Sequence, residues 1–166
     1  MNVKLRAMEP EDLDFLYQIE NNTKLWNVGV TNVPYSRYAL HHFMESSTGD
    51  IYADKQVRLM IEDEEGHVVG ITDLTDFDPR YLRAEVGIVI ANSFRRQGYA
   101  KAALSELINY ARNVLHLRQL YAIVSAENTV SVSLFCRLGF IKGAELKNWF
   151  TVADHPCDAV VMQLFL

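Results

Sequence analysis

Residues 85 to 100 read Glu85-Val-Gly-Ile-Val-Ile-Ala-Asn-Ser-Phe-Arg-Arg-Gln-Gly-Tyr-Ala100, and this stretch decides the fold. Its apolar first part predicts a buried strand. A short turn follows, and residues 98 to 115 then place small and aliphatic side chains at helical spacing, which predicts an amphipathic helix. The first N–H groups of a helix have no partner within it and lie at the positive end of its dipole. A strand that leads directly into such a helix can therefore bind phosphate.

The turn has the residue types that a pyrophosphate needs. Gly98 lacks the Cβ atom that would block close approach of the backbone, and Ala100 is nearly as small. Arg95 and Arg96 can add charge-assisted hydrogen bonds. The same short pattern also fits a plain helix N-terminus with two solvated arginines, and the sequence leaves both interpretations open. Two other phosphate-binding motifs, G-x-x-x-x-G-K-[ST] and G-x-G-x-x-G, are absent.

Around this stretch, hydrophobic periodicity and turn residues predict seven strands and four helices. The strands are expected at residues 3–7, 57–63, 68–76, 85–90, 120–124, 141–150 and 160–166, and the helices at 10–21, 37–47, 98–115 and 128–138. A loop containing Pro156 is expected between the last two strands. This order predicts a single mixed α/β domain over residues 1–166, with a mostly antiparallel twisted sheet and one βαβ crossover.

Composition and charge argue against several classes of function. The net charge is −5 and no basic stripe is present, which argues against nucleic-acid binding. No apolar run approaches the roughly 20 residues of a membrane span, and the first residues lack the apolar core of a signal peptide. Cys136 and Cys157 have no CxxC spacing, which fits the reducing cytoplasm, and Cys136 is expected to pack in the core. The histidines lack metal-ligand spacing, so no metal is predicted.

Two motifs together resemble one family. Residues 95–100 resemble the pyrophosphate loop of the GNAT superfamily of N-acetyltransferases, and residues 127–140 resemble its second signature, N-x-x-[SA]-x-x-L-Y-x-x-x-G-F. The predicted element order also matches that fold. Within the superfamily, residues 70–100 look most like the spermidine and diamine acetyltransferases, followed by the enzymes that acetylate ribosomal-protein N-termini. The resemblance implies transfer of an acetyl group from acetyl-CoA to an amine.

The resemblance also implies where acetyl-CoA binds. In this family the strand before the loop splays from its neighbour, and the coenzyme lies in the gap. The strand would contact the pantetheine arm through main-chain groups, and the loop would hold the pyrophosphate. The residues implied are Ile88, Val89, Ile90, Arg95, Arg96, Gln97, Gly98, Tyr99, Ala100, Lys101, Asn128, Ser131 and Phe135. Asn128 is also a good helix N-cap, and the two roles can coexist.

Glu85 is the candidate general base. A free alkylamine has a pKa near 10, so a base or a water relay must remove its proton. Glu85 is the only charged residue in an otherwise apolar strand, and alternation places it on one face with Gly87, which leaves room beside it. Burial would raise the pKa of Glu85 toward a useful value. The alternative is a strand-end glutamate paired with an arginine such as Arg83.

Phe135 departs from the family pattern. It stands where the family has the tyrosine that returns a proton to the departing CoA thiolate, and phenylalanine cannot do this. A missing general acid typically costs about 10²–10⁴ in rate. Two hypotheses therefore stay open. One is an active enzyme in which water, Cys136 or Tyr99 substitutes, and the other is a CoA-binding module with little or no catalysis.

The acceptor is expected to be a small polyamine-like amine or a peptide N-terminus. Asp73 and Asp76 match acidic positions of the polyamine enzymes, Tyr35 matches a further position, and Trp26 is another candidate for the acceptor pocket. The acidic residues that those enzymes have around Tyr35 are replaced here, which argues against spermidine itself as the substrate. Alternation places Asp73 and Asp76 on opposite strand faces unless a bulge intervenes, and Asp76 is expected to be a solvated strand end. Family members often dimerise, so a homodimer is the expected assembly.

Overall fold

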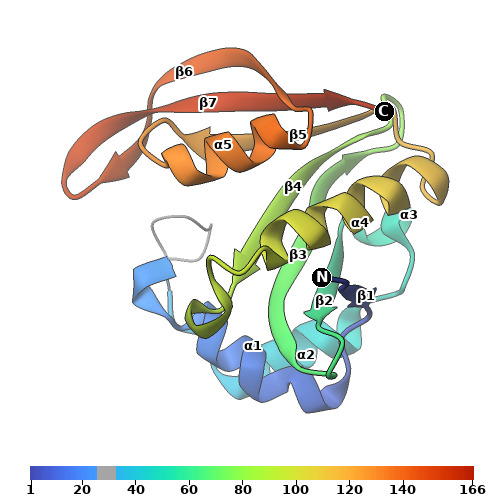
Figure 1. The fold of residues 1–166 in the computed structure, drawn as a ribbon. Helices are drawn as coiled ribbons and strands as arrows, with labels where there is room; N and C mark the ends of the chain where they lie inside the picture. Colours follow the sequence, from blue (N-terminus) through green and yellow to red (C-terminus); the bar gives the residue numbers. More distant parts are fainter. Residues whose placement is uncertain (26–32) are drawn as a thin grey trace.

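A seven-stranded sheet in the order β1-β2-β3-β4-β5-β7-β6 organises the chain (Figure 1). The computed structural model describes residues 1–25 and 33–166. The strands are β1 (Lys4–Arg6), β2 (Val57–Glu62), β3 (Val68–Asp78), β4 (Arg83–Ile90), β5 (Gln119–Ser125), β6 (Ile141–Val152) and β7 (His155–Phe165). The helices are α1 (Leu13–Glu20), α2 (Arg37–Ser46), α3 (Ile51–Asp54), α4 (Tyr99–Asn113) and α5 (Thr129–Arg137). The predicted mixed α/β fold is confirmed.

Strand pairing is antiparallel throughout the described sheet, except between β4 and β5. Strands β1 to β4 form a meander, α4 carries the chain across to β5, and β7 lies between β5 and β6. The predicted crossover is therefore confirmed. The short helix α3 was not predicted, because a single turn has no hydrophobic period; Asp50 begins it by accepting a hydrogen bond from the N–H of Tyr52 (2.9 Å).

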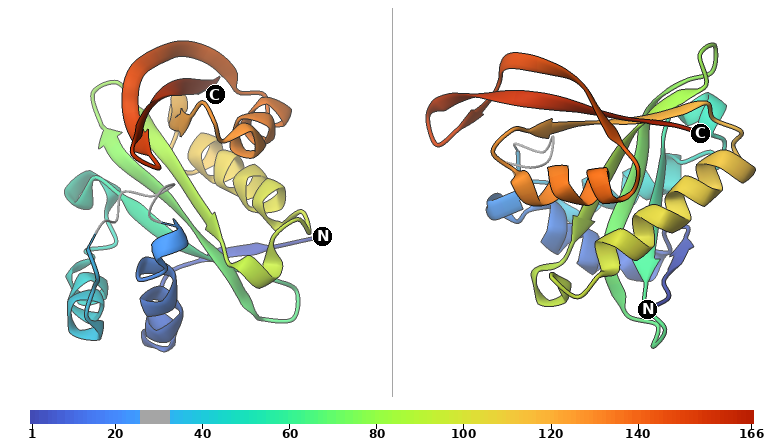
Figure 2. Two further views of the ribbon diagram at one scale, coloured as in Figure 1. Left: turned by 90° about the vertical axis from the view of Figure 1, so that its left-hand side faces the viewer. Right: turned by 45° about the horizontal axis from the view of Figure 1, so that its top comes forward.

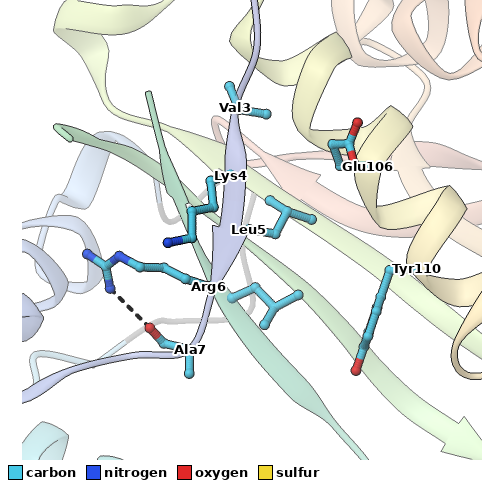
Figure 3. Close-up of a pocket in the computed structure, with 8 residues that line it drawn as sticks. Val3, Lys4, Leu5, Arg6, Ala7, Glu106 and Tyr110 are labelled. Carbon is cyan, nitrogen blue, oxygen red and sulfur yellow. Dashed lines mark hydrogen bonds between the residues drawn. The ribbon is translucent and has the colours of Figure 1, made fainter. Parts of the chain in front are cut away.

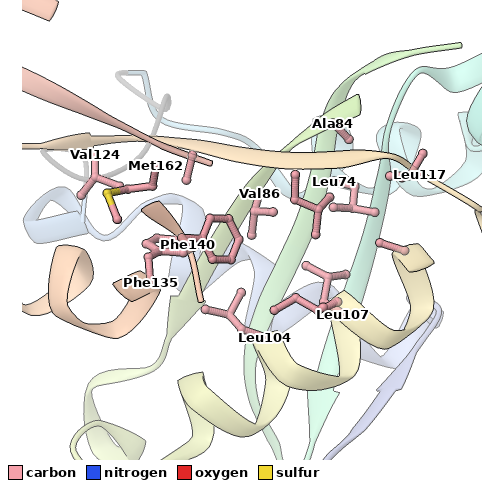
Figure 4. Packing of buried hydrophobic residues seen from close by; sticks show 14 of the residues in the cluster. Leu74, Ala84, Val86, Leu104, Leu107, Leu117, Val124, Phe135, Phe140 and Met162 are labelled. Atoms are coloured by element: carbon pink, nitrogen blue, oxygen red, sulfur yellow. The ribbon is translucent and has the colours of Figure 1, made fainter. Parts of the chain in front are cut away.

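Helices cover both faces of the sheet (Figure 2). On one face α4 and α5 bury the larger core, and Figure 4 shows how Phe135 and Phe140 pack there beside Leu104 and Val86. On the other face α1 and α2 bury Leu16 and Leu40 against β2 and β3. Because side chains alternate along a strand, β4 turns its even-numbered residues toward α4 and α5 and its odd-numbered residues toward α1 and α2. The face of α1 and α2 therefore receives the polar residues of β4.

The β6–β7 hairpin is longer than predicted. Its turn is only Ala153 and Asp154, which both have positive φ (48° and 64°), and Pro156 lies inside β7 rather than in a loop. Pro156 pairs with Thr151 of β6, while β5 pairs with β7 only from Ala159 onward. Pro156 therefore lies where β7 has a single neighbour, so its missing N–H costs nothing to the sheet. The prediction that Pro156 lies in a loop was wrong for this reason.

Polar caps begin α2 and α5 as the sequence predicted. The Ser36 hydroxyl accepts a hydrogen bond from the N–H of Ala39 (3.0 Å), and the side chain of Asn128 accepts one from the N–H of Ser131 (3.2 Å). Cys136 is exposed, so the prediction that it packs in the core was wrong: it lies about 100° around α5 from its buried neighbour Phe135. None of the helices in the described ranges combines the length and apolar character that a membrane span requires.

Candidate active site

Strands β4 and β5 separate soon after they begin to pair. Their register covers only Arg83 to Glu85 on β4, opposite Gln119 to Tyr121 on β5. Beyond that point β4 continues alongside β3, whereas β5 continues alongside β7 (Figure 1). The edge of residues 86–90 that faces β5 consequently has no strand partner. Main-chain groups left unpaired in this way need water or a ligand, which is the property that the family resemblance required of this strand.

At the unpaired edge, the main-chain N–H and C=O groups of Ile88 are available to a ligand, whereas those of Val89 are not. A Cβ atom on Gly70 of β3 would lie 2.3 Å from the carbonyl oxygen of Val89, so this carbonyl points toward β3. Successive residues of a strand direct their N–H and C=O groups to opposite sides, so those of Ile88 and Ile90 face β5. The carbonyl of Ile90 already accepts a hydrogen bond from Nε of Arg95 (3.0 Å). Ile88 therefore keeps both main-chain groups for a ligand.

The start of α4 presents a set of unused donors. Gly98 is the N-cap of α4 and has φ of 95°. The first hydrogen bond of the helix is donated by the N–H of Ala102 to the carbonyl oxygen of Gly98 (3.1 Å). The N–H groups of residues 97–101 have no hydrogen-bond partner in the described part of the chain. Arg96, also at positive φ (61°), and Lys101 are exposed beside them. Free donors and flanking cations fit the diphosphate of acetyl-CoA.

Two surface hollows lie beside α4. One of about 600 Å³ borders the N-terminus of the helix, where Gly98, Lys101 and Met1 line it. The other, of about 410 Å³, lies between β1 and α4 (Figure 3), with Leu5 of β1 on one side and Tyr110 of α4 on the other. The first hollow adjoins the unused donors of α4, and the second lies next to it, since Val3 lines both. Glu85 lines neither hollow.

Glu85 is half-buried at the point where the strands separate. It faces α1 and α2, opposite Thr75 of β3 and Tyr121 of β5. Burial raises the pKa of the Glu85 carboxyl, and the charge of Asp76 raises it further, while the N–H of Ile123 partly offsets the rise. The expected alternative, a pair with Arg83, is not found: Arg83 contacts Asp78 instead (3.3 Å). A raised pKa at the point of strand separation keeps Glu85 as the candidate base.

A bulge in β3 brings Asp76 to the face that Glu85 occupies. Thr75 pairs with Glu85 and Asp78 pairs with Arg83, so β3 has one more residue than β4 between these pairs. Asp76 lies within the bulge and adopts a left-handed conformation with φ of 51°. Its Oδ2 accepts a hydrogen bond from the hydroxyl of Tyr121 (3.0 Å). Asp76 is exposed, as predicted, but it belongs to this site.

Sequence reasoning missed Tyr121. It lies on β5 at the register position of Glu85, and both burial and its bond to Asp76 raise the pKa of its phenol above the usual value. The signal was available, because Tyr121 is the one polar side chain in the apolar run from Leu120 to Val124. The bulge in β3 could not be predicted from the sequence, and it decides whether Asp76 can reach the hydroxyl of Tyr121.

Asp73 is committed to an ion-pair network. Arg58 of β2 contacts it through two bonds (2.8 and 3.1 Å) and also contacts Glu20 of α1 (2.6 Å). The three side chains are 21%, 18% and 11% exposed, respectively. Asp73 lies opposite Gly87 of β4, so the network is beside the expected acceptor region. Its carboxylate is already neutralised there by Arg58, which makes it a weaker cation site than the sequence suggested.

Phe135 lies in the core under α4 and α5, in the same cluster as Val86 of β4 and Val124 of β5. Only 4% of it is exposed, and its ring meets that of Phe140 edge to face with centroids 4.9 Å apart (Figure 4). Asn128 and Ser131 lie at the start of α5, just beyond the end of β5. Their cap bond confirms the N-cap role of Asn128 and leaves a role in coenzyme binding as a prediction.

Tyr35 is 37% exposed, and its main-chain N–H and C=O are both bonded to the side chain of Asn21 at the end of α1 (2.7 and 2.9 Å). It therefore lies at the end of the α1–α2 layer. Trp26, the other aromatic residue predicted for the acceptor pocket, lies outside the described residues.

The β2–β3 turn contains the one group of potential metal ligands found in the described residues. Asp63, Glu65 and His67 place one ligand atom each within 4.8 Å of one another. Asp63 uses Oδ1 to accept the N–H groups of Glu65 (3.0 Å) and His67 (2.8 Å), so the cluster closes the turn. These contacts account for its geometry without an ion.

Comparisons with known proteins agree with this geometry. The family described as "Acetyltransferase (GNAT) domain" matches residues 2–141. Spermidine N(1)-acetyltransferase of Escherichia coli K12 is 30% identical over 168 residues, which cover 99% of this chain and 86% of that protein. The solved structure of Vibrio cholerae spermidine N-acetyltransferase with CoA and spermine superposes with a TM-score of 0.88 at 25% identity, covering 99% of this chain and 95% of that one. A dodecameric structure of the Vibrio cholerae enzyme has a TM-score of 0.82 at 24% identity, covering 99% and 94%. The chain therefore belongs to the GNAT family and is an N-acetyltransferase that uses acetyl-CoA.

Proposed function

We propose that the acceptor is a primary amine of a small polyamine-like cation. The observation that carries this proposal is the pair of carboxylates, Glu85 and Asp76, beside the diverging strands. Neither forms an ion pair within residues 1–25 and 33–166, and residues 26–32 contain no charged side chain. Two carboxylates without a protein cation attract a cationic substrate. The names of the E. coli and V. cholerae relatives, which act on spermidine, support the same class.

The residues act on the two reactants from opposite sides. Bound acetyl-CoA supplies an acetyl group activated as a thioester. The N–H groups at the start of α4 hold its diphosphate, and the N–H of Ile88 is placed to donate to the thioester carbonyl. Such a donor stabilises the negative charge that develops on that oxygen. Glu85 takes a proton from the ammonium group, directly or through water, because only the neutral amine is a nucleophile. Phe135 has no proton to give, so water protonates the departing sulfur.

An acceptor panel tests this proposal. Release of the CoA thiol is measured with polyamines, aminoglycosides, amino acids and peptides, each at saturating acetyl-CoA. We expect the highest kcat/KM with di- and polyamines. A peptide as the best acceptor would favour the second candidate, a protein N-terminus. Acetyl-CoA binding by calorimetry with no thiol release from any amine would favour a CoA-binding module, for which the substitution of Phe135 for the usual tyrosine is the motivating observation.

The diphosphate corner gives a prediction of its own. Gly98→Ala places a Cβ on a left-handed residue, which costs about 1–2 kcal/mol, and it crowds the donors near Sδ of Met1 (3.4 Å). We expect KM for acetyl-CoA to rise about tenfold, the equivalent of about 1.4 kcal/mol, with kcat little changed. Gly49→Ala is the matched control, because Gly49 has φ of 72° with no atom within 4 Å of the added carbon. Equal KM values for the two variants would contradict the assignment.

We also infer a homo-oligomer in the cytoplasm. The β6 strand forms an edge of the sheet with Trp149 (55%) and Ile141 (54%) exposed along it, and such an edge readily pairs with another chain. The V. cholerae relative is dodecameric in one structure. The cysteines are both free, which suits a reducing compartment. Light scattering would give a mass above 19.0 kDa for an oligomer, and a monomer mass would reject it.

A further inference from the structure

The bulge in β3 is a costly feature at an unusual place. A residue other than glycine rarely adopts positive φ, although aspartate tolerates it better than most. Leu74 and Phe77 both belong to the core under α4 and α5, although strict alternation would place them on opposite faces. The extra residue between them turns Asp76 away from that core and toward α1 and α2. The bulge therefore serves to place the Asp76 carboxylate on the same face as Glu85.

Tyr121 fixes the carboxylate once it is there. It stands at the register position of Glu85 on the neighbouring strand, and its hydroxyl donates to Oδ2 of Asp76 (3.0 Å). Asp76, Glu85 and Tyr121 thus come from three adjacent strands and meet where β4 and β5 separate. The negative charges of both carboxylates raise the pKa of the Tyr121 phenol.

The remaining charges around Glu85 are already paired. Asp73 on β3 is neutralised by Arg58 of β2, which also contacts Glu20 of α1. Arg83, two residues before Glu85 on β4, contacts Asp78. Residues 26–32 contain no titratable side chain. Asp76 forms no ion pair within the described residues, and its negative charge acts on Glu85.

We propose that Asp76, held by the hydroxyl of Tyr121, is a positioning residue whose negative charge makes Glu85 a stronger base toward the acceptor amine. This inference rests on the proposed function and adds a role for residues that do not touch the transferred group. The proton leaves the substrate ammonium nitrogen and bonds to a carboxylate oxygen of Glu85, which becomes neutral and later releases it to water. A neighbouring negative charge favours the neutral product of that transfer.

The test removes the charge of Asp76 and keeps its shape. In Asp76→Asn the amide oxygen can still accept the Tyr121 hydroxyl, so the hydrogen bond is kept. We expect the acid limb of the kcat/KM profile to move to lower pH by roughly half a unit to one unit. At neutral pH, kcat should fall about two- to tenfold because the base is weaker. Asp76→Glu, which keeps the charge, should restore the limb to near its original pH.

A second readout does not depend on turnover. Carbon-13 NMR of the glutamate carboxyl groups, with the Glu85 signal identified by its loss in Glu85→Gln, follows the titration of Glu85 directly. We expect its midpoint to be lower in Asp76→Asn than in the unsubstituted protein, even if no amine is acetylated and the proposed function fails. An unchanged midpoint overturns the inference. A raised KM for polyamines with an unmoved acid limb also overturns it, because Asp76 would then only bind substrate.

Discussion

Substituting Glu85→Gln is expected to lower kcat by about 10²–10⁴-fold, the usual contribution of a general base. The amide keeps the size of the side chain but cannot accept the proton of the ammonium group. KM for acetyl-CoA should change little, because the donors of α4 are remote from position 85. The acid limb of the pH–rate profile should disappear with the carboxylate. Steady-state kinetics with the best amine from the acceptor panel, between pH 5 and pH 9, measure all three effects.

Stability separates this chemical effect from misfolding. The pKa of Glu85 is raised in the folded protein, so its stabilising contribution is present at low pH and is lost as the pH rises from about 4.5 through the raised pKa. Glu85→Gln should therefore be at least as stable as the unsubstituted protein at pH 7. Glu106→Gln, an exposed change on α4, is the charge-matched control with full activity expected. Retention of normal kcat by Glu85→Gln would remove Glu85 as the base.

Arg58→Met should cost about 3–5 kcal/mol of unfolding free energy. The substitution leaves Asp73 and Glu20 close together in a mostly buried site without a counter-charge, and uncompensated buried charges destabilise by that amount. It also removes the guanidinium that lies 5.5 Å from the Phe43 ring of α2. Arg58 joins β2, β3 and the two helices over the acceptor face, so that face should loosen. Urea unfolding at pH 7 measures the loss.

Two further variants show whether the effect is electrostatic. Adding Asp73→Asn and Glu20→Gln to Arg58→Met removes both orphaned carboxylates, and we expect most of the lost stability to return. Arg37→Met breaks an exposed pair with Asp14 (side chains 53% and 75% exposed) and should cost about 1 kcal/mol or less. A loss of under 1 kcal/mol in Arg58→Met would mean that the network contributes little to stability.

Local sequence patterns were enough to predict the main strands, helices and helix caps. The apolar strand 85–90, the turn with Gly98 and the helical spacing after it are properties of neighbouring residues, and each formed as predicted. The Asn128 cap formed for the same reason, because an N-cap bond spans only three residues. The half-buried environment of Glu85 could also be predicted from one strand, and its role as the base stays a prediction.

Local patterns were not sufficient where a distant strand decides the outcome. β7 tolerates Pro156 because β5 does not extend beside that residue. The residues next to Pro156 in the sequence do not indicate where β5 ends. Asp73 meets Arg58 across a strand pair, and the sequence does not show that the carboxylate is already neutralised. The motif does not show that the ring of Phe135 packs against Phe140, and its place in the site stays a prediction.

The sequence by itself determined the family, the order of elements and the helix that follows Gly98, because each depends on residues within one or two turns of chain. The tertiary structure alone decided that β4 and β5 separate after Glu85, that Ile88 rather than Val89 faces the gap, and that Asp76 meets Tyr121. These features depend on one additional residue in β3 and on which strand lies alongside another. Pairing between distant segments follows from the packing of the whole sheet, and local periodicity does not predict it.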